Sequence, residues 1–199
     1  MASTIIYLSL IIIINFLITI AFAFDPTPLQ DFCVADLTSQ LSISGPLPCK
    51  DPKSVTADNF YYTGLNKPGD TSNKLNAGLT PVGVKQVPGL NTLGLSMARL
   101  DLGPGGYFPL HVHARASEIH IVLQGSLEVG FTSPEHNYTY YSKTLNVGDM
   151  FVVPAGLIHV QRNPGNVPMS SYSILNSQNP GVDEIGKAIK NLPAGQLGA

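Results

Sequence analysis

Short apolar stretches follow one another through the second half of the chain, and three of them alternate with small or polar residues at every second position. These stretches are residues 93–98, 119–123, 127–131, 150–153, 157–161 and 169–175, and Gly, Pro and Asn separate them. A period of two places successive side chains on opposite faces of a β-strand, so we predict a strand in each stretch. Several short strands divided by turn residues indicate an antiparallel sandwich or barrel.

The rest of the chain carries little regular pattern. Residues 24–81 are rich in Pro and Gly and show weak apolar periodicity, which predicts an irregular N-terminal arm wrapped over a later core. Only residues 183–190 have a helical pattern. We therefore predict an all-β fold with a barrel core at about residues 82–178, an N-terminal arm and a short C-terminal helical segment.

The first residues form a separate apolar segment. Residues 5–24 carry no charge, and a run of about 20 apolar residues is long enough to cross a bilayer. Ala21-Phe22-Ala23 is a small-x-small cleavage site, and Asp25-Pro26 follows it instead of a basic cluster, which favours a secretory signal peptide at residues 1–23. A retained anchor is the alternative, because no positive side chain precedes the segment. Residues 24–199 would then form one mature domain, with no membrane contact after cleavage.

Charge excludes one class of partner. The chain has 199 residues, with 11 Lys and Arg against 13 Asp and Glu, and its net charge is −2. Because phosphate binding requires a basic face, we expect no nucleic-acid partner. The composition, with 12% charged residues and many Gly and Pro, also excludes a coiled coil.

Two further features are typical of an exported protein. Cys33 and Cys49 are the only cysteines, and an even pair in a secreted chain predicts one disulfide, with two buried thiols as the alternative. Asn137 begins the only Asn-x-Ser/Thr sequon, inside the polar stretch 133–141, where we expect a surface loop and a glycosylation site.

Three histidines and a carboxylate form the candidate chemistry. His111 and His113 are two residues apart, so a strand would point both to one face. Glu118 opens the next apolar stretch, and His159 lies within a later one. This mixed nitrogen and oxygen set suits a divalent transition metal and leaves one or two coordination positions open, as a catalytic site requires. His120 and His136 fit no motif and are expected to be ordinary polar side chains.

The glycines and prolines around these residues strengthen the metal prediction. They match the two signature motifs of the cupin superfamily, with 22 residues between the blocks. The first block comprises Gly105, His111, His113, Glu118 and Gly125, and the second comprises Gly148, Pro154, Gly156, His159 and Asn163. The second ring nitrogen of a ligating His needs a hydrogen-bond partner, and Gln161 and Asn163 are candidates for that role.

The resemblance narrows to the plant germins and germin-like proteins. Residues 30–36, 89–99 and 177–181 resemble three segments of that family, and the similarity covers about residues 25–182. It implies a cupin β-jelly-roll barrel, one Mn²⁺ per chain held by His111, His113, Glu118 and His159, and an extracellular, apoplastic or cell-wall location. The choice of Mn²⁺ comes from the family, because the Irving–Williams order alone would favour zinc or copper.

The family also implies an oligomer, a hexamer built as a trimer of dimers. Only residues 182–199 follow the last matching segment, which is too short for the helical extension that clasps a neighbouring subunit in germins. We therefore expect a homodimer and do not expect the hexamer. Association with the cell wall is a further expectation.

Members of the family differ in activity: oxalate oxidase, superoxide dismutase and sugar-nucleotide pyrophosphatase. Oxalate-oxidising germins carry two substrate-binding asparagines; Asn91 matches the first, and Phe108 replaces the second. Because a phenyl ring cannot hydrogen-bond oxalate, we expect superoxide dismutase activity and little or no oxalate oxidase activity. The alternatives are another germin activity or a non-catalytic metal- and ligand-binding module, receptor-like or attached to the cell wall.

Overall fold

The computed structural model describes residues 30–39 and 46–190, and the predicted signal peptide at residues 1–23 lies outside these ranges. The described residues from Phe32 onward belong to one compact unit, built mainly of antiparallel strands. The strands are β1 (Ala77–Val82), β2 (Ser96–Leu102), β3 (Tyr107–Val112), β4 (Glu118–Gln124), β5 (Leu127–Ser133), β6 (Thr139–Leu145), β7 (Met150–Val153), β8 (His159–Arg162), β9 (Met169–Leu175) and β10 (Asp183–Glu184). No helix within these described ranges is long and apolar enough to cross a membrane.

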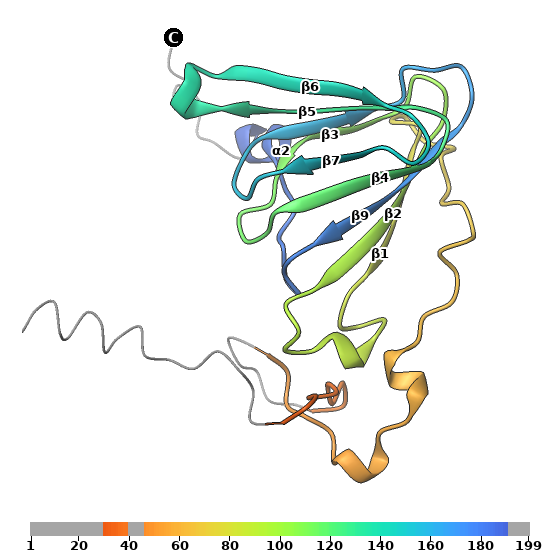
Figure 1. Ribbon diagram of the computed structural model, residues 1–199, viewed down its shortest axis with the longest axis vertical. Helices are drawn as coiled ribbons and strands as arrows, with labels where there is room; N and C mark the ends of the chain where they lie inside the picture. Colours follow the sequence, from red (N-terminus) through yellow and green to blue (C-terminus); the bar gives the residue numbers. More distant parts are fainter. Residues whose placement is uncertain (1–29, 40–45, 191–199) are drawn as a thin grey trace, which may run out of the picture. The chain divides into compact units, whose positions relative to one another are not determined.

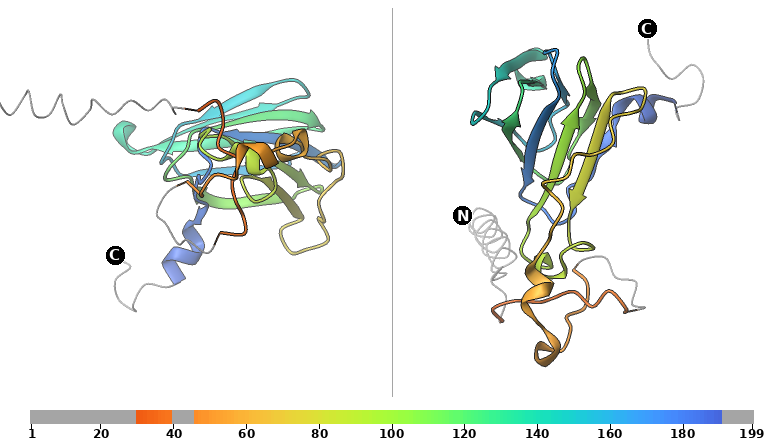
Figure 2. Two further views of the ribbon diagram at one scale, coloured as in Figure 1. Left: turned by 90° about the horizontal axis from the view of Figure 1, so that it is seen from below. Right: turned by 90° about the vertical axis from the view of Figure 1, so that its right-hand side faces the viewer.

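The strands form two five-stranded sheets, in the orders β1-β2-β9-β4-β7 and β10-β3-β8-β5-β6. Figure 1 shows both layers, with β6, β5 and β3 in one and β7, β4, β9, β2 and β1 in the other, and Figure 2 shows them from two further directions. Neighbours within each sheet are mostly distant in sequence, as in a jelly roll, in which strands alternate between two facing sheets. The predicted all-β jelly-roll class is confirmed.

Apolar side chains from both sheets meet between the layers. The core comprises Leu100, Leu102, Val122, Leu127, Val129, Leu145, Val153 and Met169. These residues come from β2, β4, β5, β6, β7 and β9, and each is at most 3% exposed. On β4 the inward positions continue from Val122 to His120 and Glu118, so the same strand joins the apolar core to the polar groups of the candidate site.

A buried ion pair holds the N-terminal arm against the outer face of β2. The Arg99 guanidinium donates to the Asp101 carboxylate and, over 2.8 Å, to the backbone oxygen of Leu65. The Asp101 carboxylate also accepts from the backbone N–H of Gly69 at 2.8 Å. Two short 3-10 helices, η1 (Pro52–Ser54) and η2 (Ala57–Phe60), lie in this arm, and η3 (Pro88–Leu90) follows β1.

Three strands, β1, β3 and β6, lie where the sequence predicted none. β1 falls largely inside the predicted irregular arm and includes Pro81, which is tolerated because β1 is the edge of its sheet. The predicted loop at residues 133–141 is shorter than expected: η4 (Pro134–His136) and the turn at Asn137 lead directly into β6. Because β6 is the other sheet's edge and is exposed on both faces over most of its length, it lacks the apolar alternation on which the prediction depended.

Some boundaries also differ. The strand predicted from residue 93 begins at Ser96, because Thr92 and Gly94 have positive φ angles of 69° and 64° and form a turn. At the other end, the predicted helix at 183–190 begins two residues later as α2 (Ile185–Lys190). The first two residues of that range pair instead with β3 as strand β10.

Candidate metal centre

Four buried side chains converge at one end of the barrel interior. They are His111, His113, Glu118 and His159, which we call the His/Glu cluster, and one ligand atom from each lies within 4.8 Å of all the others. Each of the four is at most 6% exposed. Three imidazole nitrogens and one carboxylate oxygen at this spacing can hold a divalent metal ion.

Strand pairing places two of the cluster histidines next to each other. His111 on β3 and His159 on β8 are directly opposite partners in the antiparallel ladder, so their side chains point to the same face. Their ring centroids are 4.0 Å apart. Glu118 reaches the same interior from the facing sheet, as the first residue of β4.

His113 follows β3 and depends on a distant segment. Its Nδ1–H donates to the backbone oxygen of Gly181, and its own backbone oxygen accepts from the N–H of Gly156 at 2.9 Å. Arg115 holds the Gly181 segment in place by donating to the backbone oxygen and the side-chain oxygen of Asn179, at 2.8 and 3.0 Å. The segment at residues 177–181, which resembles a germin segment, thus positions His113.

Backbone carbonyls fix the tautomers of all three cluster histidines. Nδ1 of His111 lies 2.7 Å from the oxygen of Pro109, and Nδ1 of His159 lies 2.9 Å from the oxygen of Leu157. A carbonyl oxygen can only accept, so each Nδ1 carries the proton, and the Nε2 lone pair of each neutral ring is free to bind a metal. This arrangement corrects the sequence-based expectation that Gln161 and Asn163 would bond the second ring nitrogens.

Those lone pairs point toward a carboxylate. Nε2 of His113 and Nε2 of His159 lie 3.3 and 3.2 Å from Oε2 of Glu118. A lone pair facing an anion is unfavourable in a buried site unless a cation or a proton lies between them. The donor set therefore fits a bound metal cation.

The charge states also suit metal binding. Burial, together with the nearby His159, lowers the pKa of His111 to about 3, which leaves its ring neutral near pH 7. Burial alone would raise the pKa of Glu118, but the surrounding histidines, His120 first, hold it well below its ordinary value, so the carboxylate is ionised. Burial alone would lower the pKa of His113, but its contact with Glu118 raises it, so a metal ion would have to displace a proton from Nε2 of this ring.

His120 is a buried neighbour of the cluster, and the expectation of an ordinary polar side chain was wrong. It is 0% exposed, and its Nε2 lies 3.2 Å from Oε2 of Glu118. Its Nδ1 lies 3.1 Å from the hydroxyl of Ser173, and the amide nitrogen of Gln161 lies 3.1 Å from its Nε2. The burial of His120 beside Glu118 could have been predicted from the sequence, because the two residues are two apart on β4 and share its inward face. His136, in contrast, is exposed in η4.

Asn163 braces a turn and contacts none of the cluster residues. Its amide nitrogen donates to the backbone oxygens of Leu102, Gly103 and Val167, at 3.1, 3.0 and 2.8 Å. Its side-chain oxygen accepts from the N–H of Gly165 at 2.9 Å. The motif asparagine thus has a structural role in closing the connection between β8 and β9.

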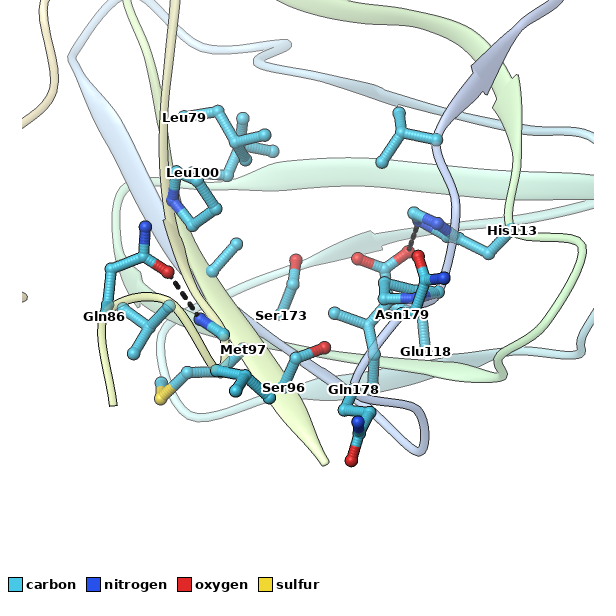
Figure 3. A pocket seen from close by; sticks show the side chains of 18 of the residues that line it. Leu79, Gln86, Ser96, Met97, Leu100, His113, Glu118, Ser173, Gln178 and Asn179 are labelled. Carbon is cyan, nitrogen blue, oxygen red and sulfur yellow. Dashed lines mark hydrogen bonds and ion pairs between the residues drawn. The ribbon is translucent and has the colours of Figure 1, made fainter. Parts of the chain in front are cut away.

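A cavity of about 470 Å³ opens beside the cluster, and His111, His113 and Glu118 line one end of it. Phe108 also lines it, with its ring edge-on to His111 at a centroid separation of 4.8 Å. Figure 3 shows Leu79, Leu100 and Met97 on one side of this pocket and His113 and Glu118 on the other.

Asn91, expected in the substrate pocket, is not among the residues that line this cavity. Its amide is bonded to both backbone groups of Leu47, accepting from the N–H at 3.1 Å and donating to the oxygen at 2.7 Å. It also lies 3.3 Å from Sγ of Cys33, which the structure joins to Cys49 in a disulfide. Asn91 therefore ties the segment that the disulfide closes to the barrel. Ala98 of β2, unlike Asn91, does line the cavity.

The chain is similar to known proteins over most of its length. The sequence model of the Cupin family matches residues 63–195. Germin-like protein 8-2 of Oryza sativa subsp. japonica is 51% identical over 171 residues, which are 85% of this chain and 77% of the relative. Germin-like protein subfamily 1 member 17 of Arabidopsis thaliana is 47% identical over 186 residues, 92% of this chain and 84% of the relative.

Solved structures agree with the sequence relatives. A structure of oxalate oxidase superimposes with a TM-score of 0.77 at 41% identity, covering 81% of each chain. The family match, the two close relatives and the shared barrel together decide the classification. This chain belongs to the germin-like proteins of the cupin family.

Proposed function

We propose that this protein is a secreted, manganese-binding germin-like protein that dismutates superoxide and oxidises oxalate little or not at all. The observation that carries the proposal is the His/Glu cluster, in which three tautomerically fixed Nε2 atoms and one ionised carboxylate converge beside an open cavity. The manganese assignment rests on the family resemblance.

The chain's own residues define what such a centre can accept. Manganese held there would supply the redox chemistry, oxidising one superoxide to O₂ and reducing a second, with two protons, to H₂O₂. Glu118 and three neutral imidazoles leave one net positive charge on a divalent site, which a monoanion such as superoxide neutralises. Because one side of the cluster faces the cavity, a small anion could reach a metal held there.

Oxalate fits this site poorly. As a dianion it would carry a second negative charge next to Ala98 and Phe108, neither of which can donate a side-chain hydrogen bond. His120 and Ser173, two of the polar residues that line the cavity, are bonded to one another. A missing hydrogen bond to a charged group costs about 1.5–3 kcal/mol, which corresponds to a loss of about ten- to hundredfold in affinity.

Paired assays test the activity. Manganese-loaded protein and its Phe108→Asn variant are assayed for superoxide removal and for H₂O₂ release from oxalate. We expect dismutation by both proteins, no oxalate turnover by the parent, and tighter oxalate binding by the variant. H₂O₂ release from oxalate by the parent at a rate comparable to its dismutation would contradict the proposal. A dismutase signal that survives His113→Ala would also contradict it, because free manganese mimics the activity.

Secretion and assembly are parts of the same proposal. The signal-like N-terminus, the disulfide and the exposed sequon residue Asn137 support export to the extracellular space or cell wall. Exposed apolar side chains on the outer face of the first sheet, Met150, Val152 and Ile174, support a homodimer that covers them. Light scattering on the secreted protein would measure its mass, and a monomer would contradict the proposed dimer.

A further inference from the structure

The cavity beside the His/Glu cluster is far larger than dismutation requires. Its volume is about 470 Å³, whereas a water molecule takes about 30 Å³ of liquid volume and superoxide has only two atoms. Cavities of about 300–1,000 Å³ with mostly apolar walls and a few polar groups are typical of sites for organic ligands. The proposed activity therefore leaves most of this space unexplained.

The wall away from the cluster is apolar and belongs to the inner faces of β1 and β2. Leu79 lies directly opposite Leu100 in the ladder, and Pro81 lies directly opposite Ala98, so all four share one face. Each of them lines the cavity, and Leu79 is 42% exposed. Pro81 is also exposed, whereas Ala98 and Leu100 are buried, so an apolar ligand would gain free energy mainly by covering Leu79 and Pro81.

With a divalent ion bound, the opposite end would attract a single negative charge. The cluster with a divalent ion carries one net positive charge, and it lies across the pocket from Leu79 and Leu100, with Ser173 between them in the view of Figure 3. A ligand that satisfies both ends has an anionic oxygen head and an apolar body. A monocarboxylate has these features, and a dicarboxylate such as oxalate lacks the apolar body.

We propose that the cavity binds an apolar monocarboxylic acid, with its carboxylate at the open position of the metal and its hydrocarbon chain along the β1–β2 wall. The proposal rests on the metal site of the proposed function but not on dismutation. It predicts that longer chains bind more tightly, by about fourfold for each methylene that the wall covers, which is about 0.8 kcal/mol per buried CH₂ converted to affinity. It also predicts that the acid blocks access of superoxide to the same position.

Calorimetry with a homologous series tests this. Full-length secreted, manganese-loaded protein is titrated with acetate, butyrate, hexanoate and octanoate, and electron paramagnetic resonance follows the Mn²⁺ signal during each titration. Leu79→Ser removes part of the wall, while Leu95→Ser is the matched control, because Leu95 has a similar exposure of 46% and does not line the cavity. Metal-free protein and Lys85→Met complete the set, since Lys85 at the cavity is the alternative partner for a carboxylate.

We expect affinity to rise with chain length, the Mn²⁺ signal to change on binding, and octanoate to inhibit dismutation. Leu79→Ser should weaken octanoate binding several-fold, and Leu95→Ser should leave it unchanged. Equal affinities along the series, or octanoate binding that is unaffected by metal removal but abolished in Lys85→Met, would overturn the proposal. Dismutation without octanoate binding would overturn only this inference, and metal-dependent octanoate binding without dismutation would overturn only the proposed activity.

Discussion

Replacing Asn163 with alanine tests whether this side chain stabilises the fold or supports metal binding. The side chain is 1% exposed, and its amide nitrogen and oxygen bond four backbone groups around the turn between β8 and β9. Its two N–H donors and its acceptor each contribute about 1 kcal/mol net, so Asn163→Ala should lower the free energy of unfolding by about 3 kcal/mol. For a chain of this length that corresponds to a decrease in Tm of about 6–12 °C.

The assay combines thermal unfolding with metal content. Asn176→Ala is the matched control, because Asn176 is exposed and accepts a single bond from the N–H of Ser117 at 2.8 Å. We expect the control to change Tm by only a few degrees and both variants to bind one metal per chain when folded. If Asn163→Ala lost its metal while unfolding at the same temperature as the control, our placement of this residue in a structural role would be refuted.

Three further predictions address the disulfide, the turns and His120. Cys49→Ser should reduce the free energy of unfolding by about 3 kcal/mol in denaturant titrations, since it opens the loop that Cys33 closes over a separation of 16 residues; an unchanged midpoint would contradict this. In the same titrations Gly125→Ala should lower the free energy of unfolding more than Gly148→Ala. Both glycines have positive φ, but of the two only Gly125 would place a Cβ against backbone, 2.8 Å from an oxygen. Equal losses of stability in the two variants would contradict this. His120→Phe should weaken metal affinity about 10- to 100-fold in chelator competition, and unaltered affinity would show that His120 does not support Glu118.

Alternation and motif spacing predicted much of the fold and the four residues of the His/Glu cluster. Strands with one buried face, such as β4 and β5, carry a period-two signal and were predicted closely. β6 was missed because six of its seven residues are exposed, which removes the contrast between the two faces. β1 was missed because an edge strand can include Pro81, a residue that normally marks a turn.

The supporting groups of the site were harder to predict, because they depend on tertiary contacts. The partners of the three Nδ1 atoms are backbone oxygens of Pro109, Gly181 and Leu157. Every residue has a backbone carbonyl, so the sequence does not indicate which carbonyl will accept such a bond. Asn91 was predicted to lie in the pocket because it matches a substrate-binding asparagine of the oxalate-oxidising germins. In the structure its amide instead bonds the N-terminal arm at Leu47. His120 could have been predicted from its place on the inward face of β4.

The His/Glu cluster, we propose, binds one manganese ion per chain. Elemental analysis together with electron paramagnetic resonance on the purified secreted protein tests it most directly, with His113→Ala as the variant and His136→Ala, at an exposed position away from the cluster, as its control. We expect one equivalent of manganese in the parent and in the control, and loss of most of it in His113→Ala. A full equivalent retained by His113→Ala, or zinc or copper in place of manganese in the parent, would contradict the account.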